Sequence, residues 1–119
     1  MTGTIAVDFD GVIHSYERGW ADGTIYGVPK PDAFTSLRHL MDRYAVYIHT
    51  TRAAEPVMTW ITERSAIPTV PDDGREFWDE RGVLMVTSRK LPALAYVDDR
   101  AVRFESWPQT LAELVERAR

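Results

Sequence analysis

The sequence predicts an α/β domain in which a Rossmann-like parallel sheet is covered by helices on both faces, giving three layers. Short apolar segments alternate along the chain with segments of helical periodicity. The apolar segments are continuous rather than alternating with polar residues, which is typical of strands buried on both faces. Three of them end in polar clusters at their C-terminal ends, the edge where open α/β sheets bind ligands.

The elements follow in order. Glycines and aromatic residues in 12–29 predict a flap, either a loop or a small hairpin, and residues 68–82 are irregular and acidic. Pro31 suits the first position of a helix whose apolar residues run from Phe34 to Tyr44. A second helix is expected at 55–64, and Leu111, Leu114 and Val115 mark a closing helix. Strands are predicted at 5–10, 45–48, 83–86 and 94–97, with a short fifth strand at 101–104.

Composition narrows the class of protein. A chain of 119 residues folds around one core, so we expect a single domain spanning 1–119. It has no cysteine, which excludes disulfides, thiol nucleophiles and cysteine-ligated zinc. The net charge of −4 gives no electrostatic reason to expect nucleic-acid or membrane binding. No apolar run approaches the roughly 18 residues of a membrane span, and the first residues lack a signal-peptide pattern. These features predict a cytoplasmic protein with no membrane partner.

Side chains that could bind a metal ion or react follow the predicted strands at their C-terminal ends. Asp8 and Asp10 end the first strand, Thr50 follows the second, and Asp98 with Asp99 follows the fourth. Converging carboxylates repel one another by several kcal/mol unless a cation lies among them. Carboxylate oxygens without a histidine or cysteine cluster favour Mg²⁺. We therefore expect a magnesium site formed by Asp8, Asp10, Asp98 and Asp99.

These residue types also suit phosphoryl transfer. Asp8 can attack a phosphorus atom and form an aspartyl-phosphate, while Asp10, on a chain that Gly11 allows to bend, offers a proton to the leaving oxygen. Lys90, one of only two lysines, would neutralise charge at the transferring group, and the Thr50 hydroxyl would hold phosphate oxygens.

In this order the motifs resemble those of the haloacid dehalogenase (HAD) superfamily. Asp8-Phe9-Asp10-Gly11-Val12 matches the first motif, Thr50-Thr51-Arg52 the second, Lys90 the third and Val97-Asp98-Asp99 the fourth. The resemblance implies that Asp8 is the nucleophile and Asp10 the general acid/base, whose backbone carbonyl also binds Mg²⁺. It implies catalytic roles for Thr50 and Lys90, substrate contacts from Gly11, Thr51 and Arg52, and metal binding by the fourth-motif acids. Which of Asp98 and Asp99 binds the metal directly stays open.

The resemblance also bears on the substrate. Neither the segment after the first motif nor that after the second leaves room for a cap domain, and capless members more often act on large or exposed phosphates. Asp98-Asp99-Arg100 looks like the fourth motif of polynucleotide 3′-phosphatases and 5′(3′)-deoxyribonucleotidases. A Mg²⁺-dependent phosphomonoesterase acting on a nucleotide or nucleic-acid-end phosphate is therefore expected.

Alternative interpretations remain. A non-catalytic HAD-fold module that binds phosphate or protein would usually have lost Asp8, Asp10 or Lys90, and all three are present. A phosphotransferase or mutase would need a cap to exclude water. On the flap, Tyr16 and Trp20 either stack on a base or pack the loop down. His49 is predicted to point away from the site, and the sequence does not indicate an oligomeric state.

Overall fold

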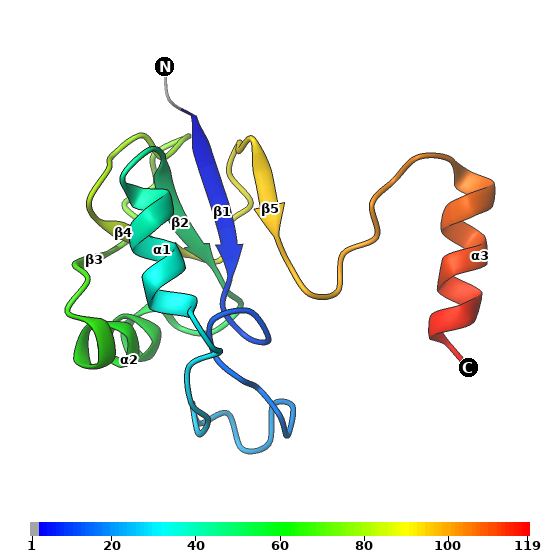
Figure 1. Ribbon diagram of the computed structural model, residues 1–119, viewed down its shortest axis with the longest axis horizontal. Coiled ribbons are helices and arrows are strands. Elements are labelled where there is room, and N and C mark those ends of the chain that lie inside the picture. Colours follow the sequence, from blue (N-terminus) through cyan, green and yellow to red (C-terminus); the bar gives the residue numbers. More distant parts are fainter. Residues whose placement is uncertain (1–2) are drawn as a thin grey trace.

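The computed structural model describes residues 3–119 and is built on a five-stranded sheet in the order β3-β4-β2-β1-β5. All its strand pairs are parallel, so the α/β prediction is confirmed (Figure 1). Because the chain returns across the sheet between β4 and β5, β1 is flanked by β2 and β5. The strands are β1 (Thr4–Asp8), β2 (Ala45–His49), β3 (Thr69–Pro71), β4 (Leu84–Thr87) and β5 (Ala95–Val97), and the helices α1 (Ala33–Met41), α2 (Ala54–Ser65) and α3 (Trp107–Arg117).

Helices α1 and α2 cover one face of the sheet. Leu37 of α1 and Val57, Trp60 and Ile61 of α2 are buried against it, so each helix turns one apolar side to the sheet. Burial of these apolar side chains supplies most of the stabilisation of this layer. The strand residues beneath them are Ile5, Val7, Val46, Ile48, Leu84 and Val86.

The opposite face is covered by irregular chain. Trp78 is buried there with Tyr47, Met85 and Leu91. The Tyr47 hydroxyl donates a hydrogen bond to the Leu91 carbonyl (2.8 Å), so a polar group on this face is satisfied without a helix. Three layers are therefore present, but the layer expected to be helical on this face consists of loop segments around Trp78 and Leu91 instead, because the remaining helix, α3, does not pack on the sheet.

The flap between β1 and α1 is closed at its base by backbone hydrogen bonds. The Ser15 N–H donates to the Val28 carbonyl (2.9 Å), and the Lys30 N–H donates to the Ile13 carbonyl (2.7 Å). These bonds join the two ends of the segment as in a small hairpin, which agrees with the prediction for residues 12–29.

Two details of the predicted elements are wrong. The acidic segment 68–82, predicted to be irregular, contains β3, which pairs with β4. With only three residues, β3 is too short for its sequence to show a strand pattern. Residues 101–104, predicted as a strand, are not in one. After β5 the chain leaves the sheet. The backbone of residues 101–104 therefore has no neighbouring strand to pair with, and an apolar sequence alone does not make a strand.

Helix α3 stands apart from the rest of the molecule (Figure 1). It contains the residues that predicted a closing helix, and its N-cap is Ser106, whose hydroxyl accepts a hydrogen bond from the Gln109 N–H (3.3 Å). None of its residues, all within the described chain, is buried. Over residues 3–119, no helix is long and apolar enough to cross a membrane.

Replacement of Trp78 by alanine should lower the free energy of unfolding by about 3–5 kcal/mol, because it empties the centre of the loop layer. Urea unfolding followed by circular dichroism measures this. Its neighbour Phe77 is exposed and provides the control, since Phe77→Ala removes a similar ring without opening a cavity. Equal losses for the two variants would contradict the assignment of Trp78 to the core.

Candidate functional site

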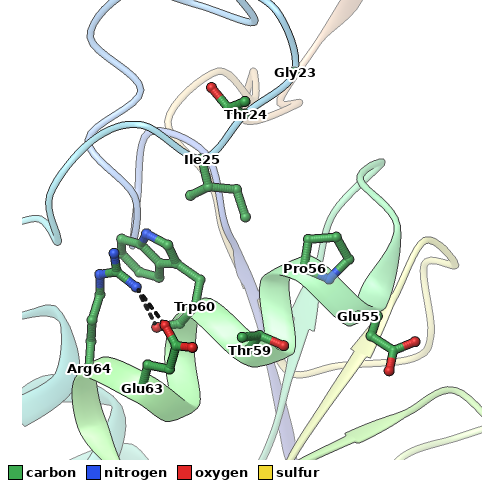
Figure 2. Close-up of a pocket in the computed structure, with 9 residues that line it drawn as sticks. All are labelled: Gly23, Thr24, Ile25, Glu55, Pro56, Thr59, Trp60, Glu63 and Arg64. Atoms are coloured by element: carbon green, nitrogen blue, oxygen red, sulfur yellow. Dashed lines mark hydrogen bonds and ion pairs between the residues drawn. The ribbon is translucent and has the colours of Figure 1, made fainter.

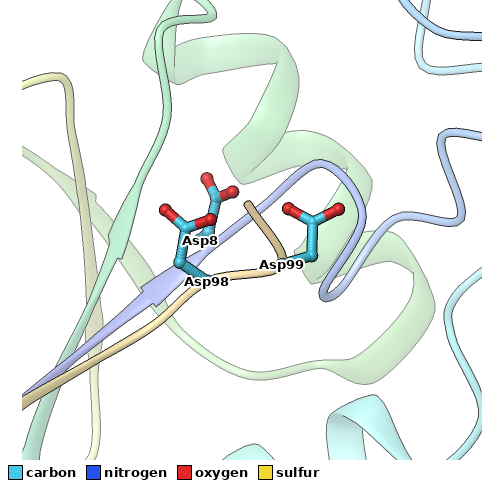
Figure 3. A group of neighbouring side chains, drawn as sticks. All are labelled: Asp8, Asp98 and Asp99. Carbon is cyan, nitrogen blue, oxygen red and sulfur yellow. The ribbon is translucent and has the colours of Figure 1, made fainter. Parts of the chain in front are cut away.

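The parallel register brings three carboxylates together at the C-terminal edge of the sheet. Asp8 is the last residue of β1, and Asp98 and Asp99 directly follow β5, its neighbour. Each offers one carboxylate oxygen within 4.8 Å of those of the other two. Figure 3 shows the three side chains converging from these two segments.

The electrostatics of this group centre on Asp8. The pKa of Asp8 is raised from 3.8 to about 6, chiefly by burial and also by the neighbouring charges of Asp98 and Asp99. The Phe9 N–H, which donates to Asp8 Oδ1 (2.9 Å), and the nearby His49 act in the opposite direction. A carboxylate with a raised pKa beside two others is a site where a cation would be favourable.

A cavity of about 160 Å³ lies beside these acids and is lined by Asp8, Asp98, Lys90 and His49. The Lys90 ammonium is 4.6 Å from the centre of the Tyr96 ring, which also lines the cavity. Lys90 and Asp8 thus line the same cavity. His49, predicted to point away, lies in this cavity instead, because it is paired with Asp8 in the parallel register of β1 and β2.

Gly11 allows Asp99 to approach the first strand. Its φ of +85° is in the left-handed region, and a Cβ built on it would lie 2.1 Å from Asp99 Oδ2. Any side chain at this position would therefore displace the Asp99 carboxylate. The position of Gly11 is explained by this close approach.

Asp10 is not part of the group of three. One of its carboxylate oxygens, Oδ1, lies 2.9 Å from Nδ1 of His14, and the other, Oδ2, accepts a hydrogen bond from Nε of Arg52 (2.8 Å). His14 is fully buried, and its Nε2 accepts a hydrogen bond from the Gly27 N–H (2.9 Å). Asp10 is thereby connected to both ends of the flap. The role of His14 could not be inferred from the sequence, since nothing in the spacing shows that residue 27 returns to it.

Arg52 extends this connection across the flap. Its Nη1 donates to the Gly23 carbonyl (2.8 Å), and its guanidinium carbon is 4.6 Å from the centre of the Trp20 ring and 5.8 Å from that of Tyr16. Its Nη2 is buried and has no hydrogen-bond partner among the described residues. One buried arginine thus holds Asp10 and the flap together, and retains a donor for a further acceptor.

The second-motif threonines are not among the residues that line the acidic cavity. Thr50 is buried, and its hydroxyl accepts a hydrogen bond from the Arg52 N–H (3.1 Å), which shapes the turn after β2. Thr51 is exposed and lines a different cavity, of about 370 Å³, with Arg52 and Asp72. Asp72, from the irregular acidic segment, accepts hydrogen bonds from the Thr87 hydroxyl and the Arg89 guanidinium.

A larger cavity of about 580 Å³ lies between the flap and α2 (Figure 2). Gly23, Thr24 and Ile25 form one wall, and α2 residues including Trp60 form the other. Its two carboxylates, Glu55 and Glu63, come from opposite ends of the helical wall and do not converge (Figure 2). This cavity lacks the grouped acids found at the sheet edge.

Comparison with known proteins provides one similar structure. No family model and no curated protein matches the sequence. The solved structure of a conserved protein from Bacteroides thetaiotaomicron is 26% identical, with a TM-score of 0.53. The similarity covers 98% of this chain and 92% of that chain, so it supports the α/β fold over nearly the full length of both. The description of that protein names no activity.

Gly11→Ala should weaken binding of a divalent cation at the acidic group at least tenfold, because the new methyl group displaces Asp99. Isothermal titration with Mg²⁺, or with Mn²⁺ as a probe, measures this. Gly82 has nearly the same φ, +84°, with nothing within 4 Å of its Cβ position. Gly82→Ala therefore carries the same backbone strain of about 1–2 kcal/mol without the contact. Equal cation affinity in both variants would contradict the role assigned to Gly11.

Proposed function

We propose that this protein is a Mg²⁺-dependent phosphomonoesterase that works through an aspartyl-phosphate on Asp8. The observation that carries the proposal is the convergence of Asp8, Asp98 and Asp99 within 4.8 Å at the C-terminal edge of a parallel sheet. Lys90 lies in the same cavity as Asp8. The order of the four motifs, which resembles that of the HAD superfamily, supports the same activity.

The three carboxylates fit a magnesium ion. They are hard oxygen donors without cysteine, and the raised pKa of Asp8 reflects burial of its carboxylate together with repulsion from Asp98 and Asp99, which a cation would relieve. Asp8, Asp98, Asp99 and the Asp10 backbone carbonyl would hold it. When bound, Mg²⁺ would neutralise negative charge on the phosphate.

The residues of this chain account for the two halves of the reaction. A carboxylate oxygen of Asp8 attacks phosphorus, and the bond to the leaving oxygen breaks as that oxygen takes a proton from the Asp10 carboxyl. Asp10, now ionised, accepts a proton from water that attacks the aspartyl-phosphate. Phosphate is released and the Asp8 carboxylate is restored. Lys90 offsets charge on the phosphoryl oxygens.

The contacts of Asp10 add a condition to this scheme. With Arg52 and His14 on its two oxygens, Asp10 is held as an acceptor. To donate a proton in the first half-reaction, its carboxyl must loosen its pairing with Arg52. Since Arg52 also binds the flap at Gly23, opening of the flap and release of Asp10 are coupled in this proposal.

The proposed substrate carries a nucleotide or nucleic-acid-end phosphate. Trp20 stays about half exposed, at 52%, although it packs on Arg52, so its ring remains accessible to a base. The flap consists of residues 12–29 only. Because this segment is short, we expect it to leave room for a large substrate. The fourth-motif resemblance to nucleotide and polynucleotide phosphatases supports this class.

Purified protein should release phosphate from nucleoside monophosphates or 3′-phosphorylated oligonucleotides in the presence of Mg²⁺, and EDTA should abolish the release. Asp8→Asn should remove activity, and Asp10→Asn should lower it by about 10²–10⁴-fold. A colorimetric phosphate assay, with a generic aryl phosphate and sugar phosphates in the same panel, measures both.

Asp73→Asn is the matched control, because Asp73 is an exposed acid that pairs with Arg75. Activity in Asp8→Asn equal to that of wild type would refute the covalent mechanism. Turnover of sugar phosphates alone would remove the nucleotide assignment. Folded, cation-binding protein without any turnover would favour the non-catalytic binding module.

Asp8→Asn should also stabilise the metal-free protein at pH 8. The folded pKa of Asp8, about 6, lies above its unfolded value, so ionisation costs stability as pH rises from about 4 to 6. Asparagine removes this cost, a gain of about 1–2 kcal/mol after solvent screening that vanishes below pH 4. Urea unfolding in EDTA at both pH values tests it.

Asp22 gives the opposite control. Hydrogen bonds from Thr24 lower its pKa, so its ionised form stabilises the fold and Asp22→Asn should bring no gain at pH 8. If Asp8→Asn were less stable than wild type at pH 8, the assigned cost of burying an ionised Asp8 beside two other acids would be wrong.

A further inference from the structure

Helix α3 has a continuous apolar face that nothing covers in the described chain. Trp107, Leu111, Leu114 and Val115 recur at helical spacing, and Phe104 packs against Trp107 with ring centres 5.3 Å apart. Their exposed fractions lie between 46% and 66%. A stripe of this size on a surface is typical of an interaction site.

A second apolar surface lies on β5. This strand is at the edge of the sheet, and all three of its residues are exposed. Tyr96 and Val97 are exposed to 44% and 43%, and the preceding Leu94 to 69%. An exposed apolar edge strand is a hazard that proteins usually cover with a helix or loop.

The helix does not cover β5 of its own chain. Arg117, in the last turn of α3, donates hydrogen bonds to the carbonyls of Arg100 and Ala101, so the helix is held against its own connecting segment. Figure 1 shows this segment leading away from β5 before α3 begins. The chain thus carries an uncovered helix and an uncovered strand, joined by residues that hold them apart.

We propose that α3 docks on β5 of a second copy of this chain, in a two-fold dimer that exchanges the helices. Each copy gives one apolar helix and receives one, so both uncovered surfaces are buried by a single symmetric contact. From the usual areas of such side chains, the exposed apolar parts of α3, Phe104 and β5 amount to on the order of 800 Å² per chain. That is about what each partner of a stable interface buries, roughly 800 Å².

The exchange would also act on the acidic group. Asp98 and Asp99 begin the segment that crosses between copies, so docking of α3 fixes both ends of that segment. The dimer contact is separate from the chemistry proposed above, and its test does not depend on activity.

The first test is the mass of the full chain in solution, measured by light scattering after gel filtration. We expect a dimer. Leu111→Glu should convert it into a monomer, because it places a charge in the apolar stripe. Gln109→Glu adds the same charge on the opposite side of the helix and should leave the dimer intact. A wild-type monomer at all concentrations, or equal effects of the two variants, would overturn the proposal.

The second test identifies which chain each helix contacts. Since the chain has no cysteine, Val97→Cys and Leu114→Cys introduce unique attachment points for a short bis-maleimide cross-linker. With both changes in one chain, a covalent dimer is expected. When each chain carries one change, linkage should form only in the mixture of the two variants. A link within one chain, a Leu114→Cys pair linked to itself, or no link at all would overturn the exchange.

Discussion

The parallel pairing of β1 with β2 and β5 is the constraint on which the site depends. The register aligns Val7 with Val97 and Asp8 with His49, so the residues that follow these strands emerge at one edge. Because β1 and β2 are buried by apolar contacts on both faces, their register cannot slip without exposing apolar side chains to water. Packing of the core thereby holds together acids that repel one another, and the pKa of Asp8 is raised by its burial there and by the charges of Asp98 and Asp99.

Much of the fold could be predicted from continuous apolar segments and helical periodicity, as at Ala45–His49 and Ala54–Ser65. The sequence also predicted that Asp8 and Asp98 meet, because both follow parallel strands. It could not reveal the contact of His14 with Asp10, which depends on how the flap returns, nor the detached position of α3. An amphipathic helix predicts an apolar partner but does not say which chain provides it.

In the proposed scheme, two further parts of the molecule act on the reacting residues. On one side, Arg52 joins Asp10 to the flap through Gly23 and Trp20, so the state of the flap and the freedom of Asp10 change together. On the other side, the segment that begins at Asp98 ends in α3, whose apolar face needs a partner. In the proposed scheme, substrate entry acts through the flap, and association of two copies steadies the acids that follow β5.

The most direct test of the covalent mechanism is to trap the intermediate. An aryl phosphate has a good leaving group, which needs no proton from Asp10, so the aspartyl-phosphate should still form in Asp10→Asn. Its hydrolysis should be slowed more, because the attacking water must give a proton to Asp10. Mass spectrometry after acid quench of this variant with Mg²⁺ and an aryl phosphate should find one phosphoryl group on the peptide that contains Asp8. Asp8→Asn should carry none. Turnover without any phosphorylated peptide, or phosphate on another residue, would contradict the account.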